Sequence, residues 1–147
     1  MIVYRITTEK WSKSLGATGY AARWNNKGNL IIYTAESRSL ACLENLVHRS
    51  GEGNNALYKV MLIDIPDKLA IEIIRIDVLK KNWYAIENYP YCQALGAKWL
   101  TELKTAVLQV PSAVIKKESN YLINPNHPDF KKIKLKATEG FDFDPRV

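Results

Sequence analysis

Short strand-like runs outnumber helical stretches along this chain, and the two kinds do not alternate. β-Branched and aromatic runs, or apolar residues with a period of two, predict strands at residues 1–6, 30–34, 57–65, 70–76, 107–110, 121–123 and 132–136. A helix also fits residues 70–76. Helical spacing predicts helices after Ser37 and over residues 92–104. A doubly wound fold needs regular alternation of strands and helices, so we expect an α+β fold.

The first expected helix has a recognisable start and end. Ser37 can cap it, and its apolar face at helical spacing comprises Leu40, Leu43, Leu46 and Val47. Residues 50–55, with two glycines and two asparagines, are expected to end it. Before it, residues 7–28 carry three glycines and are expected to be a loop.

Length and cysteine usage restrict the class of protein further. The 147 residues contain no repeat or Pro/Gly linker, so we expect residues 1–147 to form one domain. Cys42 and Cys92 belong to no CxxC or Cys/His cluster, so we expect no metal site and no disulfide framework. The chain opens without a basic n-region or cleavage site, and its apolar runs are far shorter than the ~20 residues that span a bilayer. We therefore expect a cytoplasmic protein with no membrane contact.

The positive charge is concentrated near the C-terminus. Twenty-one Lys and Arg residues against 15 Asp and Glu give a net charge of +6. Residues 116–136 hold six lysines and two acids. Lys132, Lys134 and Lys136 alternate with apolar residues, which predicts a solvated strand face or a protected sheet edge. A nucleic-acid surface would have aromatics interleaved with the lysines, and none lies among residues 132–136. A basic nucleic-acid-binding module is therefore kept only as the alternative outside enzymes.

Common catalytic motifs are absent. The sequence has no P-loop, GxGxxG, HExxH or GxSxG. His48 is expected at a helix end, where histidine usually contacts free carbonyls, and His127 is expected in a turn between an asparagine and a proline. Neither context favours a Ser-His-Asp or Cys-His mechanism.

A few polar residues lie where the expected elements end or where apolar residues would be usual; they are Arg5, Arg23, Tyr33, Glu44 and Ser112. Each alone has a structural explanation: Arg5 can pair with an acid such as Glu44, Tyr33 can belong to the core, and Ser112 can cap a turn. Together they suit a phosphate-bearing ligand, because arginine binds diphosphate bidentately and a carboxylate can stabilise an oxocarbenium ion.

These residues lie in segments that resemble the RES-domain toxins of bacterial toxin–antitoxin pairs. The similar segments, in chain order, are RWN at 23–25, YT at 33–34, LE at 43–44, PSAV at 111–114 and NxLINPxHP at 120–128. The resemblance covers nearly the whole chain. One departure is visible, because the family commonly has glycines where this chain has Ala21 and Ala22.

The resemblance implies an ADP-ribosyltransferase-like fold, in which two β-sheets frame an NAD cleft with flanking helices. It also implies a toxin that depletes cellular NAD, as substrate and not as bound cofactor, by breaking the nicotinamide–ribose bond. Glu44 and Ser112 match the family's name-giving glutamate and serine, and Arg23 matches the arginine of its RWN segment. These three are the implied catalytic residues.

The same resemblance implies the NAD-binding residues. Arg5 and Arg23 would hold phosphates or ribose, Tyr33 would stack near nicotinamide, and Asn120 is a possible ligand contact. Glu44 would stabilise the developing oxocarbenium ion while water or inorganic phosphate captures C1 of the ribose. A protein mono-ADP-ribosyltransferase is the alternative within enzymes.

The expected partners also come from the resemblance. It implies a RES–Xre type II system with an Xre-like helix-turn-helix antitoxin, and a possible toxin homodimer. We expect no direct contact between the toxin itself and nucleic acid.

Overall fold

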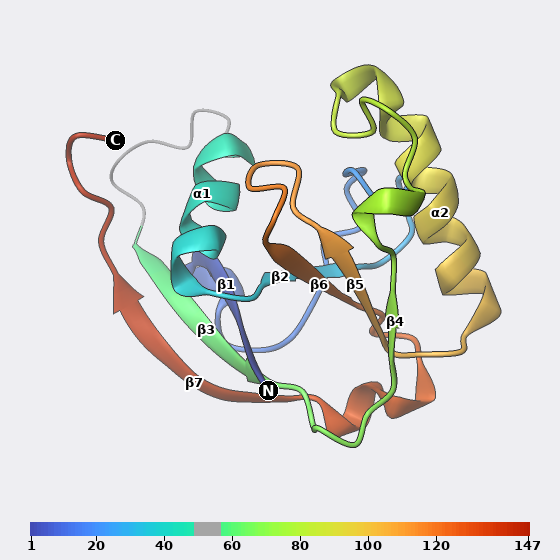
Figure 1. The fold of residues 1–147 in the computed structure, drawn as a ribbon. Coiled ribbons are helices and arrows are strands. Elements are labelled where there is room, and N and C mark those ends of the chain that lie inside the picture. The colour runs from blue at the N-terminus through green and yellow to red at the C-terminus, as the bar shows by residue number, and fades with distance from the viewer. Residues whose placement is uncertain (49–56) are drawn as a thin grey trace.

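The computed structural model describes residues 1–48 and 57–147, and the turn expected at residues 50–55 lies outside them. Over the described residues the fold is α+β, as predicted, with a seven-stranded sheet and two α-helices (Figure 1). The strands are β1 Ile2–Thr8, β2 Ile32–Ala35, β3 Tyr58–Asp64, β4 Ile71–Ile73, β5 Val107–Pro111, β6 Ser119–Ile123 and β7 Lys134–Phe141. The helices are α1 Arg38–His48 and α2 Tyr89–Glu102, and within the described ranges four short 3-10 helices connect other elements.

The strands form one sheet, which corrects the expectation of two. Their order is β4-β5-β6-β2-β1-β3-β7, and only β4 and β5 pair in parallel. The join between β1 and β2 is narrow, because a single pair of residues, Tyr4 and Ala35, is in register there. By contrast, β1 and β3 pair over seven residues. The two expected sheets are therefore two halves of one sheet, joined at this short contact.

The lysine-rich strand lies at an edge of the sheet, next to β3. It starts later than predicted, because Lys132 ends a 3-10 helix, Pro128–Lys132, that precedes it. Lys134 and Lys136 are exposed, whereas Leu135 is half-buried. Charged side chains on an edge strand discourage pairing with other chains, so this arrangement agrees with the structural explanation of the lysines.

Helix α1 begins as the sequence predicts. The Ser37 Oγ accepts a hydrogen bond from the Leu40 N–H at 3.0 Å, which satisfies one of the free donors of the first turn. Leu40 and Ala41 are buried against strands β1 and β3. The predicted apolar face is partly wrong, since Leu43 and Val47 remain 39% and 63% exposed.

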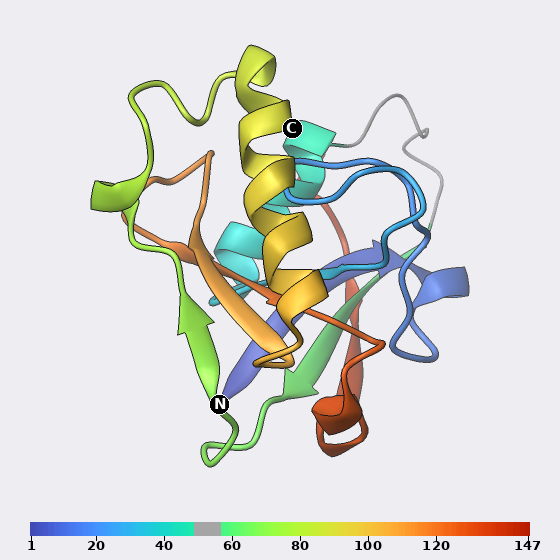
Figure 2. The ribbon, with the colours of Figure 1, turned by 90° about the vertical axis from the view of Figure 1, so that its right-hand side faces the viewer.

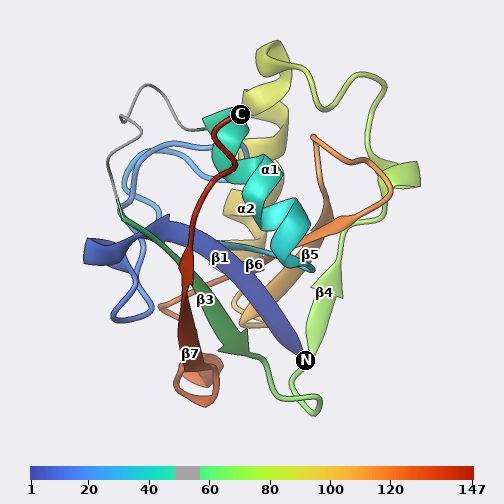
Figure 3. The same ribbon diagram turned by 90° about the vertical axis from the view of Figure 1, so that its left-hand side faces the viewer.

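Helix α2 packs on the opposite side of the strands from α1. It is nearest the viewer in Figure 2, whereas in Figure 3 α1 lies in front of α2. Trp99 of α2 belongs to a buried cluster with Trp24, Trp83 and Leu108. Gly96 allows the closest approach, because a Cβ there would lie 1.8 Å from the Trp24 carbonyl oxygen. The absence of a side chain at Gly96 thus lets α2 touch the loop that carries the RWN segment.

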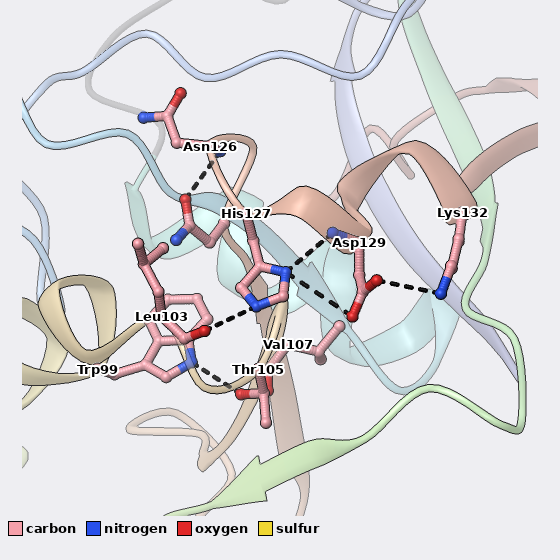
Figure 4. A network of polar contacts seen from close by, with 9 residues as sticks. Trp99, Leu103, Thr105, Val107, Asn126, His127, Asp129 and Lys132 are labelled. Carbon is pink, nitrogen blue, oxygen red and sulfur yellow. Dashed lines mark hydrogen bonds and ion pairs between the residues drawn. The ribbon is translucent and has the colours of Figure 1, made fainter.

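The end of α2 is held by a buried histidine (Figure 4). The His127 Nε2 lies 2.9 Å from the carbonyl oxygen of Leu103, the left-handed residue that follows α2. The His127 Nδ1 accepts the Asp129 backbone N–H at 3.0 Å, so Nε2 must be the protonated nitrogen. The turn predicted around His127 directly precedes the 3-10 helix before β7. The hydrogen bonds of the His127 ring therefore link the end of α2 to the start of that 3-10 helix.

The described part of the chain contains no helix that is long and apolar enough to span a membrane.

Candidate active site

A cleft of about 540 Å³ lies between α1, β1, β2 and the loop after β1. Its volume falls within the range of roughly 300–1,000 Å³ typical of small-molecule sites. Helix α1 contributes Ala41, Glu44, Asn45 and His48, which share one face of the helix. The loop contributes five consecutive residues, from Tyr20 to Trp24.

Glu44 is fixed by residues from two other elements. Its Oε1 accepts hydrogen bonds from the Ser112 Oγ and the Asn120 Nδ2, both at 2.7 Å. Its Oε2 lies 3.4 Å from the His48 Nε2. Strand β6 pairs with both β2 and β5. Because Glu44 follows β2, Asn120 lies in β6 and Ser112 follows β5, this strand order brings the three residues together.

Ser112 acts from behind the carboxylate. It is fully buried, and its Oγ also accepts the backbone N–H groups of Val114 and Ile115 at 3.0 Å each. A hydroxyl that already accepts two hydrogen bonds directs its single proton to Glu44. Ser112 is therefore placed to orient Glu44.

The environment keeps Glu44 ionised. Burial favours the neutral acid, but hydrogen bonds from His48, Asn120 and Ser112 outweigh it and hold the pKa of Glu44 below its ordinary value. A negative charge is therefore available in the cleft at neutral pH.

His48 is a cleft residue, which corrects its interpretation from the sequence. Among the described residues, it contacts the Glu44 carboxylate and not the free carbonyls expected at a helix end. The spacing of four residues was a usable indication, because residues i and i+4 are neighbours on a helix surface.

Arg5 extends from β1 into the cleft. Its Nη1 donates to the Gly16 carbonyl oxygen at 2.7 Å, and burial lowers its pKa from the high ordinary value of arginine. Among the described residues it forms no ion pair, so the structural alternative of an Arg5–Glu44 pair is wrong. Its remaining N–H donors suit an anionic ligand.

Arg23 lies against aromatic rings. Its guanidinium carbon is 4.6 Å from the ring centre of Tyr89 and 5.8 Å from that of Trp83, and its Nη1 donates to the Trp83 carbonyl oxygen at 3.2 Å. These cation–π contacts hold the guanidinium plane without neutralising its charge. Arg23 thus presents a fixed cation to the cleft.

Tyr33 connects the cleft wall to the RWN loop. Its hydroxyl donates to the Asn25 Oδ1 at 2.5 Å and accepts the Trp24 N–H at 3.1 Å. Burial raises the pKa of the phenol, so it stays protonated. Asn25, the last residue of the RWN segment, also donates through Nδ2 to the carbonyl oxygens of Tyr20, Asn26 and Asn29.

Ala21 and Ala22 fit the loop without strain. Among the described non-glycine residues, only Asn82 and Leu103 have a positive φ. The two alanines line the cleft with ordinary backbone angles, so their place before RWN does not require glycine here.

Five of the six predicted site residues, namely Arg5, Arg23, Tyr33, Glu44 and Asn120, line this single cleft, and Ser112 hydrogen-bonds to Glu44 from behind it. Asn45, His48, Tyr20 and Tyr89 also line the cleft and were missed, since contacts between distant segments leave little trace in local patterns. Fold and cleft together define an α+β protein with a half-buried carboxylate and two arginines around a small-molecule site.

The chain belongs to the RES-domain family, whose model matches residues 2–144. A relative from Sphingobium sp. (strain YBL2), named "Prs ADP-ribosylating toxin", is 37% identical over 134 residues, covering 90% of this chain and 83% of its own. The protein "Toxin Res" from Photorhabdus laumondii is 37% identical over 147 residues, covering 97% and 93%. "Toxin Res" from Yersinia enterocolitica is 33% identical over 152 residues, covering 100% and 99%.

The fold is also found in a solved structure. A chain of the Mycobacterium tuberculosis MbcT–MbcA toxin–antitoxin complex superposes with a TM-score of 0.79, covering 96% of this chain and 84% of that one. The two sequences are 18% identical, so this similarity concerns the fold.

Proposed function

We propose that this chain is a toxin of a toxin–antitoxin pair that consumes NAD by cleaving the bond between nicotinamide and ribose. The observation that carries the proposal is the ionised Glu44 carboxylate, held at Oε1 by Ser112 and Asn120 in a cleft that also presents Arg5 and Arg23. The names of the relatives support the toxin part of the proposal.

The charges of the cleft suit two parts of NAD, the diphosphate and the nicotinamide ribose. The arginines can bind the diphosphate, since guanidinium groups pair with phosphate oxygens bidentately. Glu44 can then lie beside the nicotinamide ribose, where positive charge develops as the glycosidic bond breaks. The Glu44 carboxylate needs no reorganisation for this role, because Ser112 and Asn120 already fix Oε1.

The proposed reaction is dissociative. The C1–N bond breaks and its electron pair leaves with the nicotinamide nitrogen, so a pyridinium cation becomes neutral nicotinamide and no strong general acid is needed. Glu44 stabilises the ribosyl oxocarbenium ion. Water or inorganic phosphate then forms the new bond to C1, and the proton of the incoming group is released to solvent.

Transfer of ADP-ribose to a protein is the second candidate. It is favoured by one observation, the name of the Sphingobium relative, which describes an ADP-ribosylating toxin. Both candidates share the same cleavage of the C1–N bond and differ only in the group that captures C1.

Binding to nucleic acid is less well supported. The lysines of β7 lie along a sheet edge, and the two arginines of the cleft lie in other elements.

We propose the cytoplasm as the place of action, since NAD is abundant there.

An antitoxin is the proposed partner. The solved neighbour is a toxin in complex with its antitoxin, which supports a protein partner for this chain as well. We propose an Xre-like helix-turn-helix antitoxin and toxin self-association into a dimer, both from the family resemblance.

The decisive experiment measures NAD turnover by purified protein with and without inorganic phosphate. We expect loss of NAD with release of nicotinamide, and at least a hundredfold loss of rate in Glu44→Gln, which keeps the shape of the side chain and removes its charge. Intact-mass analysis of candidate target proteins separates transfer from degradation, because only transfer leaves adducts. Unchanged NAD under all of these conditions would overturn the proposal.

A further inference from the structure

Tyr20 is a large aromatic residue that the structure leaves uncovered at the cleft. Tyr20 lines the cleft, and the residue is 78% exposed. An exposed aromatic ring beside a small-molecule site offers a flat apolar face that a planar ligand group can cover. The proposed machinery around Glu44 makes no use of this ring.

The backbone under Tyr20 is fixed on both sides. The Gly28 N–H donates to the Gly19 carbonyl oxygen at 2.8 Å, and the Asn25 Nδ2 donates to the Tyr20 carbonyl oxygen at 2.8 Å. Gln93 of α2 donates to the Ala22 carbonyl oxygen at 2.9 Å. A loop fixed in this way loses little backbone freedom when a ligand stacks on the ring.

The position of Tyr20 relative to the charges assigns it to one end of the ligand. Tyr20 lies three residues before Arg23, so their Cα atoms are no more than about 11 Å apart. Both belong to the loop wall, whereas Glu44 belongs to α1. With the diphosphate at the arginines and the nicotinamide ribose at Glu44, the part of the loop wall that holds Tyr20 is left for the group beyond the diphosphate, which is the adenosine.

We propose that Tyr20 binds the adenine ring by stacking and thereby makes the cleft selective for dinucleotides over nicotinamide mononucleotide. This inference rests on the proposed function for the orientation of the ligand. Stacking suits adenine because every nucleobase presents a π face, and removal of such a contact typically weakens binding by roughly five- to a hundredfold.

The test compares Tyr20→Ala and Tyr20→Phe with the wild type. We expect Tyr20→Ala to raise the KM for NAD with little change in kcat, so that the ratio of kcat/KM for NAD to that for nicotinamide mononucleotide falls by roughly five- to a hundredfold. Tyr20→Phe retains the ring and should keep the ratio within about twofold of the wild type. Trp11→Ala removes an aromatic residue that is 47% exposed outside the cleft and is the matched control. An unchanged ratio in Tyr20→Ala would overturn the stacking role.

Direct binding of ADP separates this inference from the proposed function. Weaker binding in Tyr20→Ala than in the wild type supports stacking even if NAD is not cleaved, in which case only the proposed function fails. Equal binding in both proteins, or no binding to the wild type, overturns stacking whether or not NAD is cleaved.

Discussion

Ser112 donates a hydrogen bond of 2.7 Å to the Oε1 of Glu44 across a sequence separation of 68 residues. The serine hydroxyl accepts hydrogen bonds from two backbone N–H groups, so its own proton is directed to the Glu44 carboxylate. The carboxylate is thereby oriented before any ligand arrives, which is the condition for electrostatic stabilisation without reorganisation.

Ser112→Ala is expected to lower kcat for NAD cleavage about tenfold and change KM much less, because Glu44 loses a donor that fixes its orientation. The same loss removes stabilisation of the ionised form and raises the pKa of Glu44. The acid limb of the pH–rate profile should move to higher pH by about one unit. Ser112→Thr, which keeps the hydroxyl, is the control, and an unmoved acid limb in Ser112→Ala would contradict the role assigned to the bond.

Glu44 should also make stability depend on pH. Its pKa in the folded protein lies below the ordinary value of 4.5, so its contribution to the free energy of unfolding is present above that value. The contribution is lost as the pH falls through the folded-state pKa. Urea denaturation between pH 3 and 7 should show a steeper acid loss for the wild type than for Glu44→Gln. Identical pH dependence in the two proteins would refute this assignment.

Tyr33→Phe tests the connection between the cleft wall and the RWN loop. The substitution leaves the Asn25 Oδ1 and the Trp24 N–H without the partner they share. We expect the free energy of unfolding to fall by about 1–3 kcal/mol and the KM for NAD to rise, because the loop also carries Arg23. Chemical denaturation and steady-state kinetics measure the two effects, and a variant as stable as the wild type would rule out the connection.

Gly96→Ala should loosen the contact between α2 and the RWN loop. Alanine in a helix normally stabilises by roughly 0.5–1 kcal/mol relative to glycine, but here its Cβ would lie 1.8 Å from the Trp24 carbonyl oxygen. The overlap decides the sign, and we expect a loss of about 3 kcal/mol in thermal or chemical denaturation. Gly140→Ala is the control, because nothing lies within 4 Å of its added Cβ. Equal stability of the two variants would disprove the close approach.

His127→Ala should destabilise the fold without a direct effect on the cleft chemistry. It leaves the Leu103 carbonyl and the Asp129 N–H without the ring that binds both (Figure 4). We expect a loss of about 2–4 kcal/mol in chemical denaturation. Lys132→Ala, which removes only the half-exposed Lys132–Asp129 ion pair, should cost less than about 1 kcal/mol. The prediction fails if the two variants are equally stable.

Local patterns predicted most strands, both helices and the Ser37 cap, because these depend on residues a few positions apart. Periodicity located α1 but not the face that it buries. Leu43 and Val47 have the spacing of a core face, yet they are exposed, and the face with Glu44 and His48 lines the cleft. A helix that covers a ligand site must place polar residues inward. Spacing alone does not distinguish a polar face that lines such a site from a polar face that is exposed to solvent.

The sequence by itself determined the order of the elements, the identity of the candidate residues and, through its similarity to RES domains, the family. Tertiary structure alone decided that Glu44, Ser112 and Asn120 meet. Separations of 68 and 76 residues are bridged because β6 lies between β2 and β5. Strand order depends on how the sheet buries its faces over the whole chain, so no local pattern encodes it. The same long-range packing joined the two expected sheets into one, through the single pair of Tyr4 and Ala35.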